Sequence, residues 1–219
     1  MEAAARSVVE RLFTELVDHQ GGPACALVRL YVTARLGELE PRLQHLARSK
    51  GRVDGPGLSI DTRCLTLLAS AGLVPAWNDR RTSENHQVIP LSDEELVTRL
   101  PMVAGLLGGL GIELASAVRP DPADNFARSG RRYDLFFVPE AADSPSVPDA
   151  GFVAHYGIRS TVGFGGVLPS GELFAVLLFT RVALTQAVAD LLRSLALTVQ
   201  ALVMPHTYRV FDRAPPAET

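Results

Sequence analysis

The feature that most constrains the fold is a pair of apolar runs joined by a four-residue turn. Residues 158–167 and 173–180 are both strand-like, and Pro169-Ser170-Gly171-Glu172 separates them. Proline early in a turn and glycine two positions later favour a tight β-turn, so the two runs predict an antiparallel hairpin. Thr185 then precedes a helical pattern of apolar residues over 186–204. Pro205 ends this predicted helix, because proline cannot continue the hydrogen-bond ladder.

The rest of the chain predicts more strands between helices. Apolar spacing predicts helices over 2–19, 39–49 and 102–110, and a capping box of Ser92 and Glu95 predicts a further helix start. We expect strands over 24–34, 63–71 and 133–138 and a short helix over 151–156, and we favour a strand over 112–118 instead of a continued helix. The fold class is therefore α+β: a twisted antiparallel sheet of about five or six strands with the terminal helices packed on one face. We expect a single domain over 1–205 and a tail or linker over 206–219.

The late part of the chain resembles the C-terminal half of a GAF domain. The run Tyr156-Gly157-Ile158-Arg159-Ser160, the glycine-bearing strand, the segment 169–179 and the final amphipathic helix follow one another in the family's order. Residues 136–145 also resemble the family's strand and following loop. The resemblance covers 133–204, and the first half matches only in the order of its elements. It implies a GAF-like sensory domain of bacterial signalling proteins, a family whose members bind unrelated ligands or none. Pro205 departs from the extended exit helix of many such modules.

Composition and charge exclude several classes of protein. A formal charge of −3 over 219 residues argues against a nucleic-acid-binding surface. Two cysteines, Cys25 and Cys64, do not make a disulfide framework, and we expect buried reduced thiols. The chain opens without a signal-peptide pattern, and no apolar run approaches the length of a membrane span. We therefore expect a cytoplasmic protein with no membrane or nucleic-acid partner.

The polar loop over residues 75–91 is the predicted recognition site. It contains the only tryptophan of the chain, which offers a stacking face, and arginines that suit a carboxylate or a phosphate. We expect Trp77 and His86 to lie on the same side of the sheet, near any cavity. The candidate ligand-binding residues are Trp77, Asn78, Arg80, Arg81, His86 and Arg159. The alternative is structural: Trp77 plugs the edge of the core, Asn78 makes a turn, the loop arginines are solvated and Arg159 pairs with an acid or a carbonyl.

No motif for catalysis, a metal or a cofactor appears. The five histidines are scattered without ligand spacing, and no nucleophile motif is found. The run Gly163-Phe164-Gly165-Gly166 lies in a predicted strand with no helix directly after it, so it favours close packing or a bulge over a phosphate cradle. We expect no enzyme activity and no haem, flavin, bilin or metal.

Two functions fit these observations. The first is a non-catalytic sensory domain that binds a small ligand or a partner, such as a signalling protein, and relays the event through the terminal helices. The alternative is a protein-interaction scaffold with no small-molecule ligand. An open cavity lined by polar groups of the Trp77 loop favours the sensor, and a filled apolar interior favours the scaffold. The last helix is apolar around much of its circumference, so we also expect a homodimer through the first and last helices.

Overall fold

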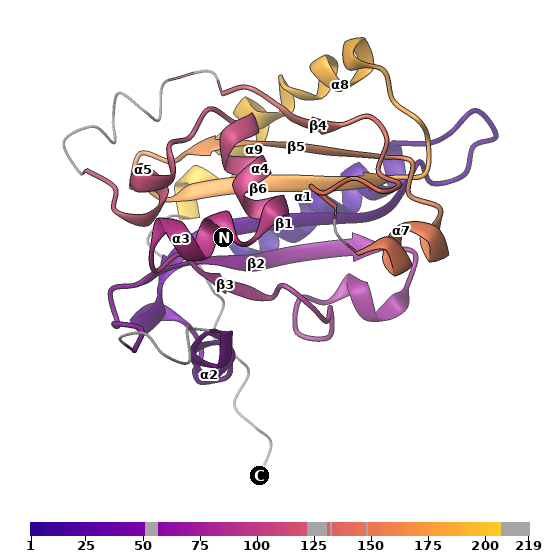
Figure 1. Ribbon diagram of the computed structural model, residues 1–219. Coiled ribbons are helices and arrows are strands. Elements are labelled where there is room, and N and C mark those ends of the chain that lie inside the picture. The colour runs from indigo at the N-terminus through magenta and orange to yellow at the C-terminus, as the bar shows by residue number, and fades with distance from the viewer. Residues whose placement is uncertain (51–56, 122–130, 132, 148, 207–219) are drawn as a thin grey trace.

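A computed structural model describes residues 1–50, 57–121, 131, 133–147 and 149–206. The chain forms a six-stranded antiparallel sheet in the order β3-β2-β1-β6-β5-β4 with helices on both faces (Figure 1), so the predicted α+β class and strand number are confirmed. The strands are β1 Cys25–Arg35, β2 Arg63–Gly72, β3 Val88–Pro90, β4 Phe136–Val138, β5 Ser160–Val167 and β6 Leu173–Thr180. Most of the predicted tail, residues 207–219, lies outside the described residues.

The predicted hairpin and its turn are confirmed. β5 and β6 pair antiparallel from Ser160 opposite Thr180 to Val167 opposite Leu173. Gly171 adopts a φ of +88°, which glycine tolerates without a steric penalty, and its N–H donates to the carbonyl of Leu168. Local turn chemistry therefore fixes the register of this half of the sheet.

The central strand β1 divides the molecule into two layers, because successive side chains of a strand point to opposite faces. Val28, Leu30 and Val32 join the core on the side of the terminal helices, whereas Leu27 and Tyr31 join the core on the other side. Both cores are buried, so this strand is covered on each face. Neighbouring residues of β1 therefore belong to opposite cores.

The terminal helices pack on one face of the sheet, as predicted. The helix α1 Glu2–Glu15 contacts β1, β2 and α9, and α9 Leu195–Val203 also contacts β5. The single predicted last helix divides into α8 Gln186–Leu192 and α9 at Arg193 and Ser194, which keep right-handed helical dihedral angles. The predicted cap is present, since the Thr185 hydroxyl accepts the N–H of Val188.

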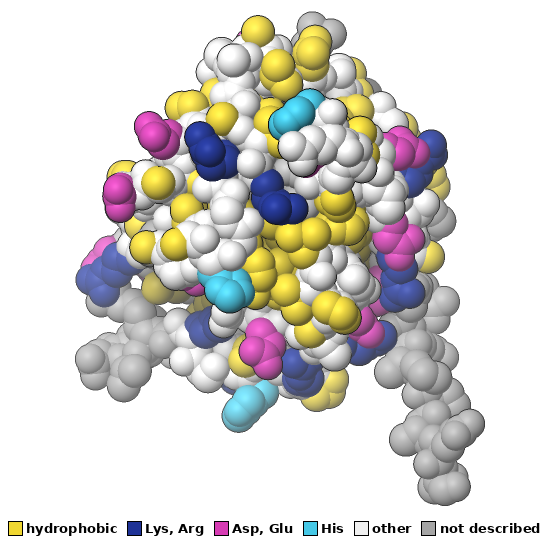
Figure 2. All heavy atoms as spheres, turned by 90° about the vertical axis from the view of Figure 1, so that its right-hand side faces the viewer, with side chains coloured by type: hydrophobic (Ala, Val, Ile, Leu, Met, Phe, Trp, Pro, Cys, Tyr) yellow, Lys and Arg dark blue, Asp and Glu magenta, His cyan; other side chains and the backbone are white. Residues whose placement is uncertain are grey.

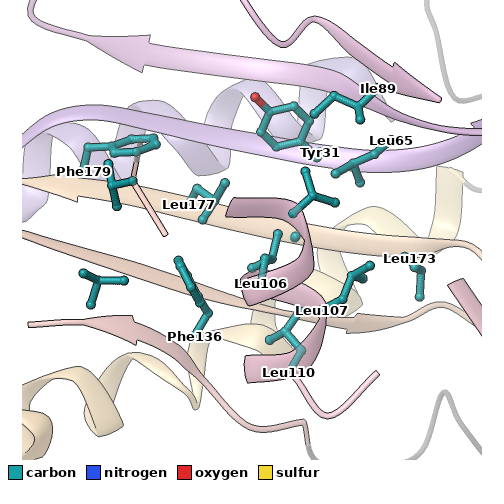
Figure 3. Packing of buried hydrophobic residues seen from close by; sticks show 14 of the residues in the cluster. Tyr31, Leu65, Ile89, Leu106, Leu107, Leu110, Phe136, Leu173, Leu177 and Phe179 are labelled. Carbon is teal, nitrogen blue, oxygen red and sulfur yellow. The ribbon is translucent and has the colours of Figure 1, made fainter. Parts of the chain in front are cut away.

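The opposite face is covered by short helices. They are α3 Glu94–Thr98, α4 Pro101–Gly109, α5 Leu114–Val118 and α7 Ala150–Tyr156. Leu106, Leu107 and Leu110 of the α4 region lie over the sheet in Figure 3. Gly163 permits this approach, because a Cβ there would meet the Leu106 side chain at 2.6 Å. The predicted role of this glycine run in close packing is therefore confirmed.

A smaller cluster closes the end of the sheet where β1 stops. The 3-10 helix η1 Leu36–Glu38 and the helix α2 Pro41–Lys50 pack there against Cys64 and Val88. The 3-10 helix η2 Pro75–Asn78 follows β2, and η4 Met204–His206 follows α9. Cys25 and Cys64 are both free and buried, as predicted.

Two local predictions were wrong. Residues 112–118, predicted as a strand, contain the helix α5, whose Ala117 is buried in the same core as Ile112. A short apolar run has no clear period, and its contacts with α3 and α4 decide the outcome. The cap before α3 is Asp93 instead of Ser92, since the Asp93 carboxylate accepts the N–H of Leu96 at 2.8 Å.

One helical stretch is apolar enough to cross a membrane by length and composition alone. It spans Gln186–Val203, and 17% of that window is buried. The sequence prediction that no apolar segment approaches a membrane span is therefore too strict. The buried core helix of a soluble protein passes the same test, but most of this window is exposed, whereas the described sheet carries a buried core on each face.

Candidate functional site

A cavity of about 170 Å³ lies between the sheet and the helices of the α4 and α7 side. Its floor comes from β1, β2, β3 and β6, and its walls come from α4, α7 and the loop after η2. Figure 2 views the side on which α7 lies, where hydrophobic side chains gather beside basic and histidine side chains. The lining residues are Leu27, Arg29, Tyr31, Leu65, Trp77, Glu84, Asn85, His86, Ile89, Leu100, Pro101, Met102, Val103, Leu106, Val147, Asp149, Phe152, Leu177 and Phe179.

An aromatic wall forms one side of the cavity. The ring of Trp77 lies edge-on to Tyr156 at 4.6 Å and to Phe152 at 5.9 Å between centroids. Phe152 in turn meets Phe179 at 5.2 Å with perpendicular planes. Edge-to-face pairs at these separations are favourable, so they hold the indole of Trp77 in η2 against α7. Gly72 makes room for it, because a Cβ at that position would lie 2.8 Å from the indole.

Arg29 is a buried cation at the cavity floor, with 6% of the residue exposed. Its Nη2 donates to the Glu84 carbonyl at 2.8 Å and to the Ser83 hydroxyl at 3.0 Å. Its Nη1 donates to the Asn85 carbonyl at 3.1 Å and lies 3.4 Å from the Tyr31 hydroxyl. All four acceptors are neutral oxygens. Within the described part of the chain the guanidinium has no carboxylate partner, and its Nε has no hydrogen-bond partner.

Two buried polar residues shape the loop above Arg29. The Gln87 side-chain amide donates to the carbonyls of Arg80, Arg81 and Ser83 at 3.0–3.1 Å. The Ser83 hydroxyl lies 3.2 Å from that of Ser70 on β2. Asn85 and His86 follow with positive φ angles of 61° and 56°. Non-glycine residues seldom adopt this conformation, and it persists where surrounding contacts hold the backbone in place. The hydrogen bonds of Gln87 and Ser83 supply such contacts for this loop.

His86 stands at the cavity rim close to other basic groups. Desolvation by the surrounding protein lowers its pKa below the usual 6.5, although the residue as a whole is exposed. The charges of Arg29 and Lys50 lower it further, and the carboxylate of Asp149 opposes them. Burial and the charge of Arg29 also lower the pKa of Lys50. Arg29, Lys50 and His86 therefore form a basic cluster at this side of the cavity.

The structure brings together some of the predicted site residues and separates others. Trp77 and His86 both line the cavity, as predicted. Asn78 instead accepts the N–H of Gly72 at 2.8 Å, which fixes the end of η2. Arg81 is half-buried outside the lining, with its N–H bonded to the Asp79 carboxylate at 2.8 Å.

Arg159 also lies outside the cavity lining. It precedes β5, where its N–H donates to the Thr180 carbonyl at 2.7 Å. Its side chain is exposed, and within the described part of the chain it makes no hydrogen bond or ion pair. Its backbone position joins the ends of β5 and β6, so its observed contacts are structural.

Arg80 is buried in an ion-pair network away from the cavity lining. Its Nε lies 2.9 Å from a Glu2 oxygen, and its Nη2 lies 2.6 Å from a Glu40 oxygen. The side chains of Arg80 and Glu2 are only 4% and 3% exposed. Arg80 therefore ties the cavity loop to α1 and to the segment before α2, instead of facing a ligand.

The principal cavity residue that the sequence reasoning missed is Arg29. It stands in the run Cys25-Ala26-Leu27-Val28-Arg29, inside an otherwise apolar strand. A lone charged residue within such a run was the available signal, because a buried cation seldom persists without a partner or a function. Asp149 and Phe152 were missed for another reason, since α7 reaches the cavity only through the tertiary fold.

Among the described residues no group of three or more His, Cys, Asp or Glu side chains could hold a metal ion. Comparisons of the chain with models of known protein families, with curated proteins and with solved structures found no match. The chemistry of the cavity is thus an apolar and aromatic chamber with a basic group at its floor and hydrogen-bonding groups on one loop.

Proposed function

We propose that this chain is a non-catalytic, GAF-like sensory domain that binds a small molecule in the cavity between the sheet and α4. The observation that carries the proposal is the cavity itself, lined by apolar side chains and by polar groups of the loop that holds Trp77 and His86. Concave, mostly apolar sites with a few convergent polar groups are the usual form of small-molecule sites. An open cavity with these polar groups favours the sensor over a scaffold without a ligand.

Two sets of contacts support the proposed relay to the terminal helices. Ligand binding biases the position of the loop that holds Ser83 and His86, and Arg80 in the same loop is ion-paired to Glu2 of α1. The helix α1 packs against α9 on the far face of the sheet. A ligand that binds one loop conformation more tightly than another favours the helix arrangement that accompanies it. The difference between the two affinities sets the size of this shift. The resemblance of residues 133–204 to GAF domains supports a role in bacterial signal transduction, for which we propose a cytoplasmic location.

The second candidate function, protein interaction, is favoured by one separate observation. Apolar side chains on α8 and α9 are exposed, with Leu191 72%, Leu197 50% and Leu202 49% exposed. An apolar surface of this kind is typical of a contact face. We propose that a second copy of the chain covers it, so that the sensor is a homodimer and the two functions are compatible.

The proposed ligand site can be tested by a binding screen with the full chain. Trp77 is the only tryptophan and lines the cavity, so its fluorescence reports directly on occupancy. We expect a subset of small metabolites to raise the melting temperature and to change Trp77 emission.

A matched pair of variants assigns that signal to the cavity. Val103→Phe fills space at the lining and should abolish the response, whereas Ile60→Phe in the exposed turn before β2 should keep it. A broad screen in which no compound changes either readout would contradict the proposed ligand binding.

A further inference from the structure

Arg29 suggests the chemical class of the ligand. A buried guanidinium normally pairs with a carboxylate, because burial of an unpaired charge is costly. The other buried arginines among the described residues follow this rule, since Arg63 pairs with Glu172 at 3.1 Å and Arg80 pairs with Glu2. Arg29 is equally buried and lines the cavity, but its acceptors in the described chain are neutral oxygens. The missing partner is a negative charge.

Two hydrogen-bond donors at the cavity floor suit such a charge. The Nη1 of Arg29 makes only a long contact of 3.4 Å with the Tyr31 hydroxyl, and a carboxylate oxygen is a stronger acceptor for it. The buried Tyr31 hydroxyl accepts weakly from Arg29, and its own proton goes to no acceptor within the described part of the chain. Arg29 and Tyr31 lie two positions apart on β1 and therefore on the same face of the sheet. A carboxylate at this point would bond to both.

The remaining charges at the cavity also bear on where an anion would lie. His86 lines the cavity together with Arg29, and the Lys50 ammonium donates to the carbonyl of Val88 on β3 at 3.3 Å. The charge of Arg29 lowers the pKa of both His86 and Lys50. Asp149 is a cap of α7, where its carboxylate accepts the N–H of Phe152. Glu84 is exposed and faces Arg29 through its carbonyl. Both acids also line the cavity, so the anion is expected at the guanidinium of Arg29, which carries the opposite charge.

The volume and the aromatic wall limit the rest of the ligand. The cavity of about 170 Å³ is close to the ~150 Å³ of an engineered cavity that binds benzene. Leu177 and Phe179 project from β6 next to Tyr31, on the side of the sheet that carries Leu106 (Figure 3). Together with Trp77 these residues give an apolar chamber that suits one ring.

We propose that the cavity binds a single-ring organic carboxylate, with the carboxylate at the Arg29 guanidinium and the Tyr31 hydroxyl and the ring against the Trp77 and Phe179 side. This inference rests on the proposed ligand-binding function and adds the charge and the size of the ligand. Arg29 sets the preference for an anion, and Tyr31 orients it by a second hydrogen bond.

Benzoate and its neutral isostere benzamide test the inference on the unmodified full chain. Dissociation constants at pH 7 are measured by Trp77 fluorescence and by calorimetry. We expect benzoate to bind about tenfold or more tightly than benzamide, the effect of one or two charge-assisted hydrogen bonds. One contrary outcome is that benzoate and benzamide bind equally, and another is that benzoate fails where a neutral or cationic compound binds in the cavity. Either outcome would refute the anionic ligand but not the proposed sensory function. Absence of any ligand overturns both.

Three variants separate charge from shape. Arg29→Gln should reduce the preference for benzoate to about onefold, and Arg29→Lys should retain part of it because the charge stays. Tyr31→Phe keeps the apolar contacts and should weaken benzoate binding by about threefold to tenfold with little effect on benzamide. A Tyr31→Phe protein with unchanged benzoate affinity, or a folded Arg29→Gln protein that keeps the preference, contradicts the assignment.

Discussion

Arg80 and Glu2 form a buried ion pair, with 2.9 Å between Nε and a carboxylate oxygen, that connects the cavity loop to the first turn of α1. The two residues lie far apart in sequence and belong to different layers of the fold. Glu40 binds the same guanidinium from the segment before α2. Three parts of the chain thus meet at one side chain.

Replacement of Arg80 by methionine is expected to destabilise the protein by about 3 kcal/mol, because it leaves Glu2 buried without this partner. Glu40 loses its short contact with Arg80 at the same time. Urea unfolding followed by circular dichroism measures the loss. Arg11→Met is the matched control, since Arg11 and Glu15 form an exposed pair worth under about 1 kcal/mol. A similar small effect for both variants would contradict a structural role for Arg80.

Local signals predicted the late half of the fold well. Pro169 and Gly171 specify their turn through their own backbone preferences, and Thr185 caps α8 through a contact three residues away. Such features depend on neighbours in the sequence, which is why the hairpin and the helix start agree with the structure. The strand predicted over 112–118 failed because that choice depends on packing against α3 and α4.

The candidate site was only partly predictable for the same physical reason. Trp77 and His86 stood out by their residue types in a polar loop. Arg29 donates hydrogen bonds to Ser83 and Glu84, which follow it in the sequence by 54 and 55 residues. The environment of Arg29 therefore exists only in the folded chain. Arg80 had the right chemistry for an anion, but buried partners from α1 and the segment before α2 engage its guanidinium.

The two cysteines are expected to resist alkylation in the folded protein. Burial raises the pKa of both Cys25 and Cys64 to about 12, so almost no reactive thiolate exists at pH 8. Both residues also lie in the sheet without exposed surface. Native protein treated with iodoacetamide should keep its unmodified mass over an hour, whereas protein in urea should gain two adducts. Rapid native labelling of either thiol would show that its strand opens readily.

His86 is expected to titrate below 6.5 in the folded protein, because desolvation first and then Arg29 and Lys50 disfavour its charged form. A histidine that binds its proton less readily when folded makes stability fall as the pH drops from 6.5 toward the folded pKa. NMR titration of the imidazole measures the midpoint. Lys50→Met should raise it, and Asp149→Asn, which can keep the α7 cap, should lower it. Opposite shifts would contradict the charge assignment.

The homodimer prediction concerns the exposed apolar side of α8 and α9. Leu197 and Leu202 are about half exposed although they occupy the helix that packs on the sheet. The chain's own α1 contacts α9 but leaves these side chains uncovered. A two-fold contact would bury the same surface on both copies. A membrane surface is the competing occupant, because Gln186–Val203 is also apolar enough for a lipid contact.

Light scattering at tens of micromolar should therefore give twice the mass of the 23.5 kDa chain. Leu197→Glu and Leu202→Glu should each shift the protein to a folded monomer, because the charge would be buried at the two-fold contact. Ile60→Glu is the control, since Ile60 is 65% exposed in the turn before β2 and should leave the mass unchanged. A monomeric unmodified protein would refute the dimer. Binding of that monomer to lipid vesicles, lost in Leu197→Glu, would assign the apolar surface to a membrane instead.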